Sequence, residues 1–345
     1  MASHNSYHRR ARNFQSVRCL QDLANALKIP SSKIALQSLH PQYHVFTLFK
    51  GNGKKRLIED PAPLLKKILR QLNECIQAQY YTLRPDAVHG FCVSNDEEED
   101  RNIRSNARRH MGNPWLLNID FRDFFHTILT DRVAAIWQQH FPKMNEELVN
   151  TLTQLTCYNH RLPMGAPTSP ALSNFAALAL DAELETFCSN SGMVYTRFAD
   201  DCSFSSHQKI DATTIGIIRS AVKGHRFLIN EDKVKLFTPK DTKVVTGIVV
   251  GEDALSLPEK YLYKLDEEIT RYTHTRLVEQ RFQTGMSLKK LKLFEQELRG
   301  KLSFANMVMG DHEEVIQLQA RFEEAIHPPE DFESDNWLDI PYTFF

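Results

Sequence analysis

The sequence has few cysteines, and they are widely scattered. Six cysteines are scattered over 345 residues without a Cys-x-x-Cys motif: Cys19, Cys75, Cys92, Cys157, Cys188 and Cys202. This spacing argues against a zinc knuckle and a disulfide framework, and it is typical of the reducing cytoplasm. No apolar run is long enough to span a bilayer. The N-terminus, MASHNSYHRRARNFQ, lacks the apolar core of a signal peptide and indicates a short basic arm. We therefore expect a cytoplasmic protein without a membrane partner.

A strong net charge is also lacking, but the charges are unevenly distributed. The chain carries −1 overall, and residues 311–345 contain ten acidic residues and one arginine, a balance of −9. The first 310 residues therefore carry +8. Their basic residues cluster at 8–12, 50–56, 66–70, 101–110 and 289–301. A basic region with several such clusters could bind along a phosphate backbone, although solvated helix faces explain any single cluster equally well.

The order of strand and helix patterns predicts an α+β fold. Tyr43–Phe49 and Arg56–Glu59 read as a hairpin with a turn at Gly51-Asn52-Gly53, and a helix pattern follows Pro61. Later patterns are a strand at 115–119 switching to a helix, a long helix from Ser169, strands near 193–206 and 244–256, and helices from 258 to 327. We expect a basic helical extension over 1–40, a mixed body over 41–255, a helical unit over 256–327 and an acidic aromatic tail over 328–345.

Two adjacent aspartates interrupt an apolar, strand-like segment, TRFADDCSFSS. Successive strand residues point to opposite faces, so a continuous strand would bury one of the carboxylates at high cost. A tight turn between two strands removes this problem, because it presents Asp200 and Asp201 at one edge. Mg²⁺ prefers such oxygen ligands, and two ions about 4 Å apart can hold the attacking and leaving oxygens of a phosphoryl transfer. An exposed polar turn without a metal is the alternative.

A two-metal site requires a further carboxylate, and Asp120 is the best candidate. It ends the apolar strand WLLNI and precedes FRDFFHTIL, which reads as a helix. The alternative is that Asp120 only caps this helix.

Between about Tyr43 and Ile269, seven segments resemble the conserved blocks of a reverse transcriptase and follow one another in the same order. KGNGKKRLIEDP resembles the fingers hairpin, AVHGF the second block, and LLNIDFRDFF the block with the first metal-binding aspartate. LPMGAPTSPALSN resembles the block beneath the incoming nucleotide, and RFADD resembles the active-site turn. INEDKVKLF and TGIVVGEDALSLP resemble the following block and the primer grip. The resemblance implies a right-hand polymerase: fingers and palm with an antiparallel sheet, followed by a helical thumb.

Two shorter motifs resemble the retron branch of this family. NARRH, from Asn106 to His110, matches an Asn-Ala-x-x-His motif, and Val245-Thr246-Gly247 matches a triplet of retron enzymes. The branch implies an enzyme that copies a partner non-coding RNA into branched, RNA-linked DNA (msDNA), primed from an RNA 2′-OH. It also implies an effector protein in an anti-phage defence system. A different bacterial reverse transcriptase and an RNA-binding scaffold that controls an effector stay open as alternatives.

The resemblance assigns roles residue by residue. The catalytic, metal-binding residues would be Asp120, Asp200 and Asp201, which would bind two Mg²⁺ ions (or Mn²⁺ as a substitute) together with the carbonyl of Phe121. Nucleotide binding would involve Lys50, Arg56, Asp123, Phe124, Phe125, Met164, Gly165 and Lys233. Nucleic acid would be contacted by Asn106, His110, Phe198, Val245, Thr246, Gly247, Lys289, Lys290, Lys292, Arg299 and Lys301.

Several of these roles have a physical basis. Lys50 and Arg56 would contact the triphosphate, since the arginine fork suits phosphate. Asp123 and Phe124 would offer backbone N–H groups at a helix start, a natural anion site. Phe125 lies where the family has an aromatic steric gate against the ribose 2′-OH, with core packing as the alternative.

One position departs from the family pattern. Met164 precedes Gly165 where the family usually has glutamine, and a thioether cannot supply the hydrogen bonds of an amide. Nucleotide affinity or fidelity would change, whereas metal chemistry would not. Lys233 is a candidate for protonating the pyrophosphate leaving group.

Overall fold

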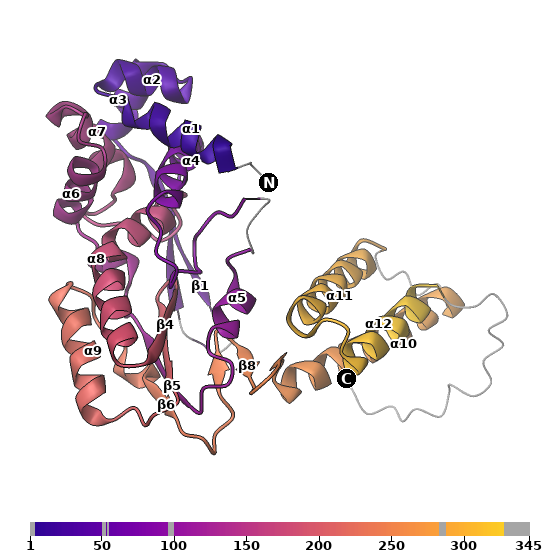
Figure 1. Ribbon diagram of the computed structural model, residues 1–345. Helices are drawn as coiled ribbons and strands as arrows, with labels where there is room; N and C mark the ends of the chain where they lie inside the picture. Colours follow the sequence, from indigo (N-terminus) through magenta and orange to yellow (C-terminus); the bar gives the residue numbers. More distant parts are fainter. Residues whose placement is uncertain (1–3, 50–52, 54, 96–99, 283–287, 328–345) are drawn as a thin grey trace. The chain divides into compact units, whose positions relative to one another are not determined.

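The chain forms two compact units in the computed structural model (Figure 1). The structure describes residues 4–49, 53, 55–95, 100–282 and 288–327. The first unit comprises Met1–Thr246 and Val250–Asp253, and the second comprises Gly247–Val249 and Ala254–Phe345. Lys50 and the predicted acidic tail lie outside the described residues. The architecture is α+β, as predicted.

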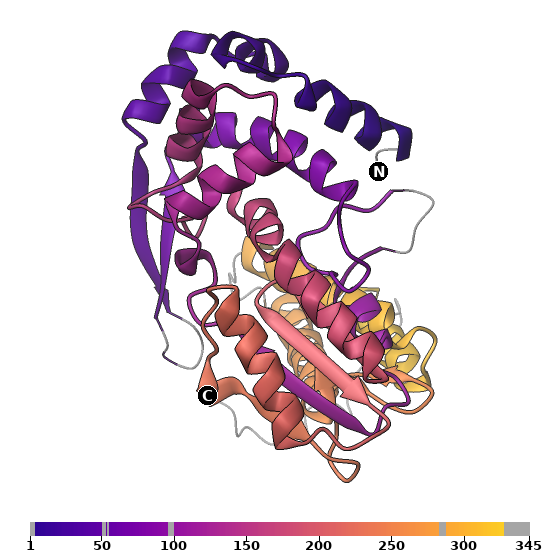
Figure 2. The same ribbon diagram turned by 60° about the vertical axis from the view of Figure 1, so that its left-hand side comes forward.

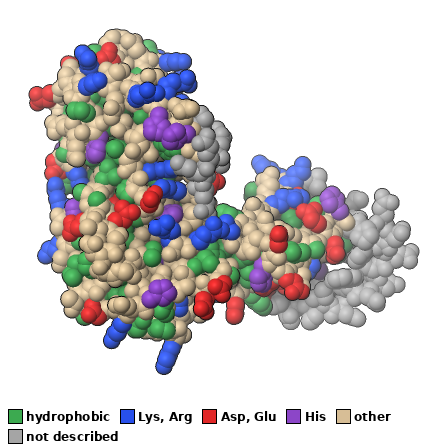
Figure 3. Space-filling model, viewed as in Figure 1, with side chains coloured by type: hydrophobic (Ala, Val, Ile, Leu, Met, Phe, Trp, Pro, Cys, Tyr) green, Lys and Arg blue, Asp and Glu red, His purple; other side chains and the backbone are tan. Residues whose placement is uncertain are grey.

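The first unit begins with three helices, followed by a two-stranded hairpin and a fourth helix. These elements are α1 (His4–Gln15), α2 (Leu20–Leu27), α3 (Ser31–Leu39), β1 (Tyr43–Phe49), β2 (Lys55–Pro61) and α4 (Pro63–Tyr81). The hairpin is confirmed, with the second strand longer than predicted. Apolar residues at helical spacing place Leu65, Ile68 and Leu72 of α4 in the core, where α1 contributes the buried Phe14. Lys and Arg side chains gather over these N-terminal helices (Figure 3).

An antiparallel sheet forms the centre of the first unit, in the strand order β4-β5-β3-β6. Its strands are β3 (Trp115–Asp120), β4 (Met193–Phe198), β5 (Asp201–Ser206) and β6 (Lys235–Phe237). One face is covered by α8 (Ser169–Asn190) and α9 (Ala212–Gly224), while α5 (Ile103–Arg108) packs on the other (Figures 1 and 2). The predicted strand at 115–119 and the helix from Ser169 are confirmed.

The helix predicted directly after Asp120 is wrong. The chain makes a turn, then one 3₁₀ turn, η1 (Phe125–Thr127), and only then α6 (Thr130–His140) and α7 (Glu146–Thr156). The N–H of Phe121 donates to Asp200 and that of Arg122 donates to Leu228, so these groups pair with neighbouring segments. Asp123 adopts a left-handed φ of 51°, which an α-helix does not contain.

The second unit is mainly helical. It contains α10 (Glu259–Phe282), α11 (Leu288–Met309) and α12 (Glu313–Ile326). Ile269, Tyr272, Leu298 and Phe322 are buried where the three helices pack. Earlier in the chain, η2 (Glu231–Lys233) and the short strand β7 (Val244–Val245) belong to the first unit. The residues of β8 (Ile248–Val250) are divided between the two units, and β9 (Leu255–Ser256) belongs to the second. Within the described ranges, no helix combines the length and apolarity needed to cross a membrane.

Candidate active site

The adjacent aspartates lie at a tight turn between β4 and β5. Phe198 pairs with Asp201, so Ala199 and Asp200 form a two-residue turn, and Ala199 has a φ of 58°. The half-buried Phe198 ends β4, and Asp201 begins β5. The turn therefore presents both carboxylates at the end of the sheet, which relieves the conflict posed by a continuous strand.

Asp120 lies beside this turn because of the strand register. It pairs directly with Asp201 across β3 and β5, and the next residue, Phe121, donates its N–H to the carbonyl of Asp200 at 2.9 Å. Asp120 is buried. The capping position of η1 is occupied by Phe124, with no side-chain hydrogen bond to the element, so Asp120 does not cap it. The register thus brings Asp120, Asp200 and Asp201 to one end of the sheet.

The grouped carboxylates disturb each other's ionisation. Partial burial raises the pKa of Asp200, and the negative charge of Asp120 adds to this effect. Partial burial, the charges of Asp200 and Asp120, and a hydrogen bond to Asp120 raise the pKa of Asp201 to about 7. Such mutual repulsion favours either a shared proton or a bound cation.

Lys233 places an ammonium group at the same end of the sheet. Its Nζ lies 2.6 Å from Oδ2 of Asp120, and Asn230 donates to Oδ1 at 3.1 Å. Burial lowers the pKa of Lys233, but the hydrogen bond to Asp120 and the three aspartate charges outweigh this, and its pKa is raised. Lys233 is therefore a cation that partly neutralises the carboxylates.

The donor chemistry suits a hard divalent cation, since it consists of carboxylate and carbonyl oxygens. Across the described ranges, however, no three His, Cys, Asp or Glu side chains form a group that could hold a metal ion without rearrangement. The ammonium of Lys233 already occupies one oxygen of Asp120. The residues thus fit the ion chemically, and binding would require the side chains to turn toward a common point.

A buried ion pair supports the turn from behind. Arg197 of β4 and Asp181 of α8 form hydrogen bonds of 2.6 and 2.8 Å, and both side chains are fully buried. Arg197 also donates to the carbonyl of Ala199 and to the side chain of Asn174, each at 3.0 Å. Tyr195 donates to Asp181 at 2.8 Å. Every strong hydrogen-bonding group of the pair therefore has a partner, as burial requires.

The segment resembling the second family block packs directly on this turn. Arg197 donates its backbone N–H to Ala87, and His89 donates to the carbonyl of Arg197. A Cβ at Gly90 would lie 2.3 Å from the backbone nitrogen of Ala199, so no larger residue fits there. Gly90 thus allows the segment to approach the backbone of the turn closely.

The buried Glu59 of β2 joins three segments, one of which contains the predicted nucleotide-binding residues Met164 and Gly165. Its carboxylate accepts hydrogen bonds from Arg161 at 2.9 and 3.1 Å and from the backbone N–H of Met164 at 3.0 Å. His126 lies 3.3 Å from the same carboxylate. The backbone of Glu59 donates to the carbonyl of Met164 at 2.7 Å, and a Cβ at Gly165 would lie 2.7 Å from the Glu59 carbonyl. Backbone contacts therefore hold the Met164–Gly165 loop where the family has glutamine.

One of the remaining predictions about nucleotide-binding residues requires a correction. Phe125 is half-buried, with ring centroids 5.6 Å from Phe124 and 5.9 Å from Phe91. Arg56 is exposed, and its charge acts to lower the pKa of Asp200. Asp123 and Phe124 lie in a turn before a three-residue 3₁₀ element, so the anion site predicted from a helix start lacks its helix.

The retron-like motifs are mostly interior. Asn106 and His110 are each 1% exposed, and His110 bonds with Ser205 and Thr196 at 2.7 Å. Neither amide atom of Asn106 has a partner among the described residues. Their side chains are thus inaccessible to nucleic acid in this conformation, which contradicts the predicted direct contact.

The Val245-Thr246-Gly247 triplet divides between the two units. Val245 is buried in β7, and Thr246 has a φ of 47°. Gly247, with a φ of 85°, belongs to the second unit. The side chain of Val245 is therefore inaccessible, and the triplet forms a tight turn.

The predicted basic contacts of the second unit lie on α11. Lys289, Lys290 and Lys292 are exposed. Arg299 instead pairs with Glu295 at 3.1 Å and with Glu323 at 3.4 Å. Lys301 pairs with Glu268 at 2.6 Å and with Glu297 at 3.1 Å. The lysines nearest the start of α11 are thus better suited to bind phosphate.

The sequence interpretation missed the supporting residues Asp181, Arg197, Glu59 and Arg161. A signal was available for Arg197, because an arginine inside the apolar strand MVYTRF must find a buried partner. Glu59 and Arg161 carried no such signal, since their pairing depends on segments about a hundred residues apart.

Comparison with known proteins identifies a matching family and several similar proteins. A family model described as "Reverse transcriptase (RNA-dependent DNA polymerase)" matches residues 49–273. The chain is 27% identical to the retron Ec86 reverse transcriptase of Escherichia coli, over 70% of this chain and 74% of that one. It is 26% identical to the retron Mx162 reverse transcriptase of Myxococcus xanthus, over 84% of this chain and 65% of that one. The telomerase structure from Candida albicans overlaps 83% of this chain and 63% of that one, with 10% identity and a TM-score of 0.47.

Proposed function

Because this chain belongs to the reverse transcriptase family, we propose that it copies a structured non-coding RNA into DNA by two-metal nucleotidyl transfer. It is an RNA-directed DNA polymerase with the α+β fold of a right-hand polymerase, and its motifs resemble those of the retron type. In the proposed assignment, residues 41–255 form the fingers and palm, residues 256–327 the thumb, and residues 1–40 a helical extension.

One observation carries the proposed site. The register of β3 with β5 pairs Asp120 with Asp201, and the adjacent Asp200 is joined to Phe121 by a backbone hydrogen bond. Three carboxylates gathered at one sheet end, with raised pKa values at Asp200 and Asp201, form a strongly anionic site. Reverse transcriptases generally use divalent metal ions, and we propose two Mg²⁺ ions, with Mn²⁺ as a substitute, at these residues and the Phe121 carbonyl.

The side chains around the site would have separate roles in the reaction. Bound ions would activate the primer hydroxyl and stabilise charge on the leaving pyrophosphate. Arg56 would bind the triphosphate, the ring of Phe125 would exclude a ribose 2′-OH, and Lys233 would donate a proton to pyrophosphate. The backbone of the Met164–Gly165 loop, fixed by Glu59, would lie beneath the nucleotide.

The retron relatives support a more specific proposal about substrate and partners. The template would be a partner non-coding RNA, the first primer an RNA 2′-OH, and the product msDNA. The exposed Lys289, Lys290 and Lys292 would hold duplex by its backbone. An effector protein in anti-phage defence would complete the system. All six cysteines are free thiols, which supports a cytoplasmic location.

The test is a primer-extension assay with purified full-length protein and the variant Asp201→Asn. Loss of a metal ligand should cost more than the roughly 10–100-fold expected for an outer-shell partner. Glu252→Gln, at an exposed carboxylate, is the control. RNA binding, measured separately, should change little.

Two outcomes would count against the proposal. Asp201→Asn extending primers at the wild-type rate would remove the triad from catalysis. If nucleic acid that copurifies with the protein from its native locus contained no DNA, the retron assignment would fail. A biological phenotype that survives Asp201→Asn would favour an RNA-binding scaffold instead.

A further inference from the structure

A side-chain bridge crosses the face of the central sheet that also carries Asp120. Alternation along β3 turns Leu117 and Ile119 toward the main core. It leaves Asn118 and Asp120 on the opposite face, two residues apart. Asn118 pairs with Ser203 of β5 in the same register that pairs Asp120 with the active-site turn. Asn118 is therefore the neighbour of a proposed catalytic carboxylate on one face of one strand.

Both polar atoms of the Asn118 amide form hydrogen bonds. Its Nδ2 donates to the carbonyl of Val244 in β7 at 2.7 Å, and its Oδ1 accepts from the hydroxyl of Ser203 at 3.0 Å. The two bonds require a side chain that donates and accepts, which an amide does and an ionised carboxylate or an aliphatic group of the same size does not. Asn118 thus ties β7 to the strand that ends in Asp120.

Residues 243–251 form a hairpin, the β7 hairpin, which is closed by a hydrogen bond of 2.9 Å from the N–H of Val250 to the carbonyl of Lys243. A second anchor lies where α5 packs against β7. Gly112, which follows α5, donates its N–H to the carbonyl of Gly251 at 3.1 Å. One bond therefore holds each end of the hairpin.

The β7 hairpin ends in a tight turn. Thr246 and Gly247 have φ values of 47° and 85°, which is typical of a two-residue hairpin turn, and Gly247 is exposed. We propose that Asn118 is a positioning residue that fixes this turn relative to Asp120, so that a primer end resting on the turn meets the carboxylates. The inference rests on the proposed function, since it takes the predicted nucleic-acid contact of Thr246 and Gly247 to be made by the primer.

The test compares Asn118→Leu, which nearly keeps the volume, with Ser203→Ala, which removes the other bond of the same amide. Hydrogen exchange measured by mass spectrometry should become faster in the β7 hairpin of Asn118→Leu. Single-turnover addition of one nucleotide to a bound primer should slow by about 10–100-fold in this variant, because a misplacement of about 1 Å can cost that much. The Kd for primer–template should stay close to that of the wild type. Ser203→Ala should keep both the rate and the hairpin protection.

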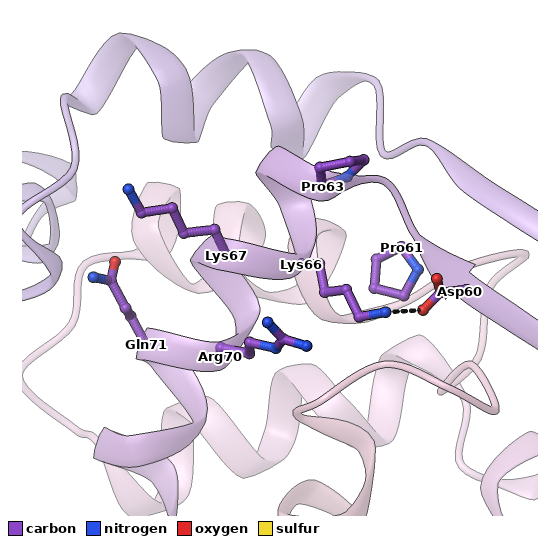
Figure 4. Close-up of a pocket in the computed structure, with 7 residues that line it drawn as sticks. All are labelled: Asp60, Pro61, Pro63, Lys66, Lys67, Arg70 and Gln71. Carbon is purple, nitrogen blue, oxygen red and sulfur yellow. Dashed lines mark hydrogen bonds and ion pairs between the residues drawn. The ribbon is translucent and has the colours of Figure 1, made fainter. Parts of the chain in front are cut away.

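Two further variants separate positioning from misfolding. Asn118→Asp keeps the volume and the acceptor for Ser203 but offers no donor to β7 when ionised, so it should reproduce the result if Asn118→Leu does not fold. Asp60→Asn breaks the ion pair of 2.6 Å with Lys66 beside the cavity between β2 and α4 (Figure 4). It controls for a general loss of stability and should leave exchange in the β7 hairpin unchanged.

The outcomes distinguish this inference from the proposed function. A loosened hairpin with a wild-type rate in Asn118→Leu would overturn the positioning role, and so would a slower rate with unchanged exchange. Equal slowing in Ser203→Ala would also overturn it, because the effect would then lie in the packing of the sheet. An active wild type with unaffected variants would end this inference alone, whereas a wild type that extends no primer would end both proposals.

Discussion

Arg197 and Asp181 form a fully buried ion pair behind the turn that carries Asp200 and Asp201. The guanidinium of Arg197 donates to both Asp181 and the carbonyl of Ala199. Asp181 of α8 therefore restrains the turn through Arg197. Burial alone would lower the pKa of Arg197, but the charge and hydrogen bonds of Asp181 outweigh it and keep the group charged. The position of the proposed catalytic residues therefore depends on a charge pair that is itself fully buried.

Breaking this pair should unfold or weaken the protein strongly. Asp181→Asn leaves Arg197 buried without its counter-charge, and we expect a loss of about 3–5 kcal/mol in the free energy of unfolding, measured by denaturant titration. Asp131→Asn breaks the exposed pair with Arg226 and should cost less than about 1 kcal/mol.

A double variant separates stability from positioning. Replacing the buried pair by apolar residues, as in Asp181→Leu/Arg197→Met, should recover part of the lost stability. Primer extension should stay low, because the carbonyl of Ala199 has still lost its donor. Full activity in a stable double variant would show that the pair has no positioning role.

Glu59→Gln should impair nucleotide use more than RNA binding. The substitution keeps the volume but removes the charge that Arg161 and His126 face. We expect about 1–3 kcal/mol of destabilisation, on the scale of hydrogen bonds to charged groups. A larger KM for the incoming nucleotide should appear in single-nucleotide incorporation kinetics, because the Met164–Gly165 loop loses its anchor. Glu74→Gln, in an exposed pair, is the control, and equal kinetic effects in both variants would contradict this role.

Phe125→Ala should relax discrimination against ribonucleotides. If the ring blocks a 2′-OH, its removal should lower the ratio of deoxynucleotide to ribonucleotide incorporation by about 10-fold or more, in line with steric discrimination worth about 1–3 kcal/mol. Competing incorporation assays measure this ratio directly. Phe124→Leu, which changes a buried ring beside it, should reduce stability and leave the ratio unchanged. A falling melting temperature without a change of ratio in Phe125→Ala would mean that the ring only packs.

Buried histidines should make the fold sensitive to mild acid. Burial lowers the pKa of His110 to about 3 and that of His89 to about 4, from an ordinary value of 6.5. Nearby Arg101 and Arg109 act in the same direction on His89, and Asp86 opposes them. Between pH 6.5 and about 4 the unfolded chain binds protons that the native state excludes. The contribution of the two neutral histidines to the free energy of unfolding is therefore complete above pH 6.5. It declines as the pH falls, by about 1.4 kcal/mol per pH unit for each group.

The variant His110→Gln isolates this effect from other titrations. Asp201, with its raised pKa, acts in the opposite sense over the same range, so wild type and variant must be compared at each pH. His110→Gln should be less stable at pH 7.5, because its bonds to Ser205 and Thr196 are disturbed. Its stability should nevertheless fall less between pH 6.5 and 4.5. Parallel stability curves for the two proteins would rule out His110 as an acid-sensitive group.

Several elements could be predicted because their signals lie within short stretches of the sequence. Neighbours within a few residues are enough to predict three features: the hairpin that begins with Tyr43–Phe49, the apolar stripe of α4 and the Asp200–Asp201 turn. The fold class followed from their order, because each pattern has one favourable way to bury its apolar face. The aspartates also stood out locally, since paired charges in an apolar strand require a special environment.

The contacts that hold these residues in place arise from the packing of elements far apart in the chain. The segment after Asp120 has the composition of a helix, but Phe121 and Arg122 donate their N–H groups to distant segments, and a turn results. Likewise, Glu59 finds Arg161, and Arg197 finds Asp181, through packing between elements far apart in the chain. Buried charges select partners by three-dimensional proximity, and no periodicity in a single sequence encodes that choice.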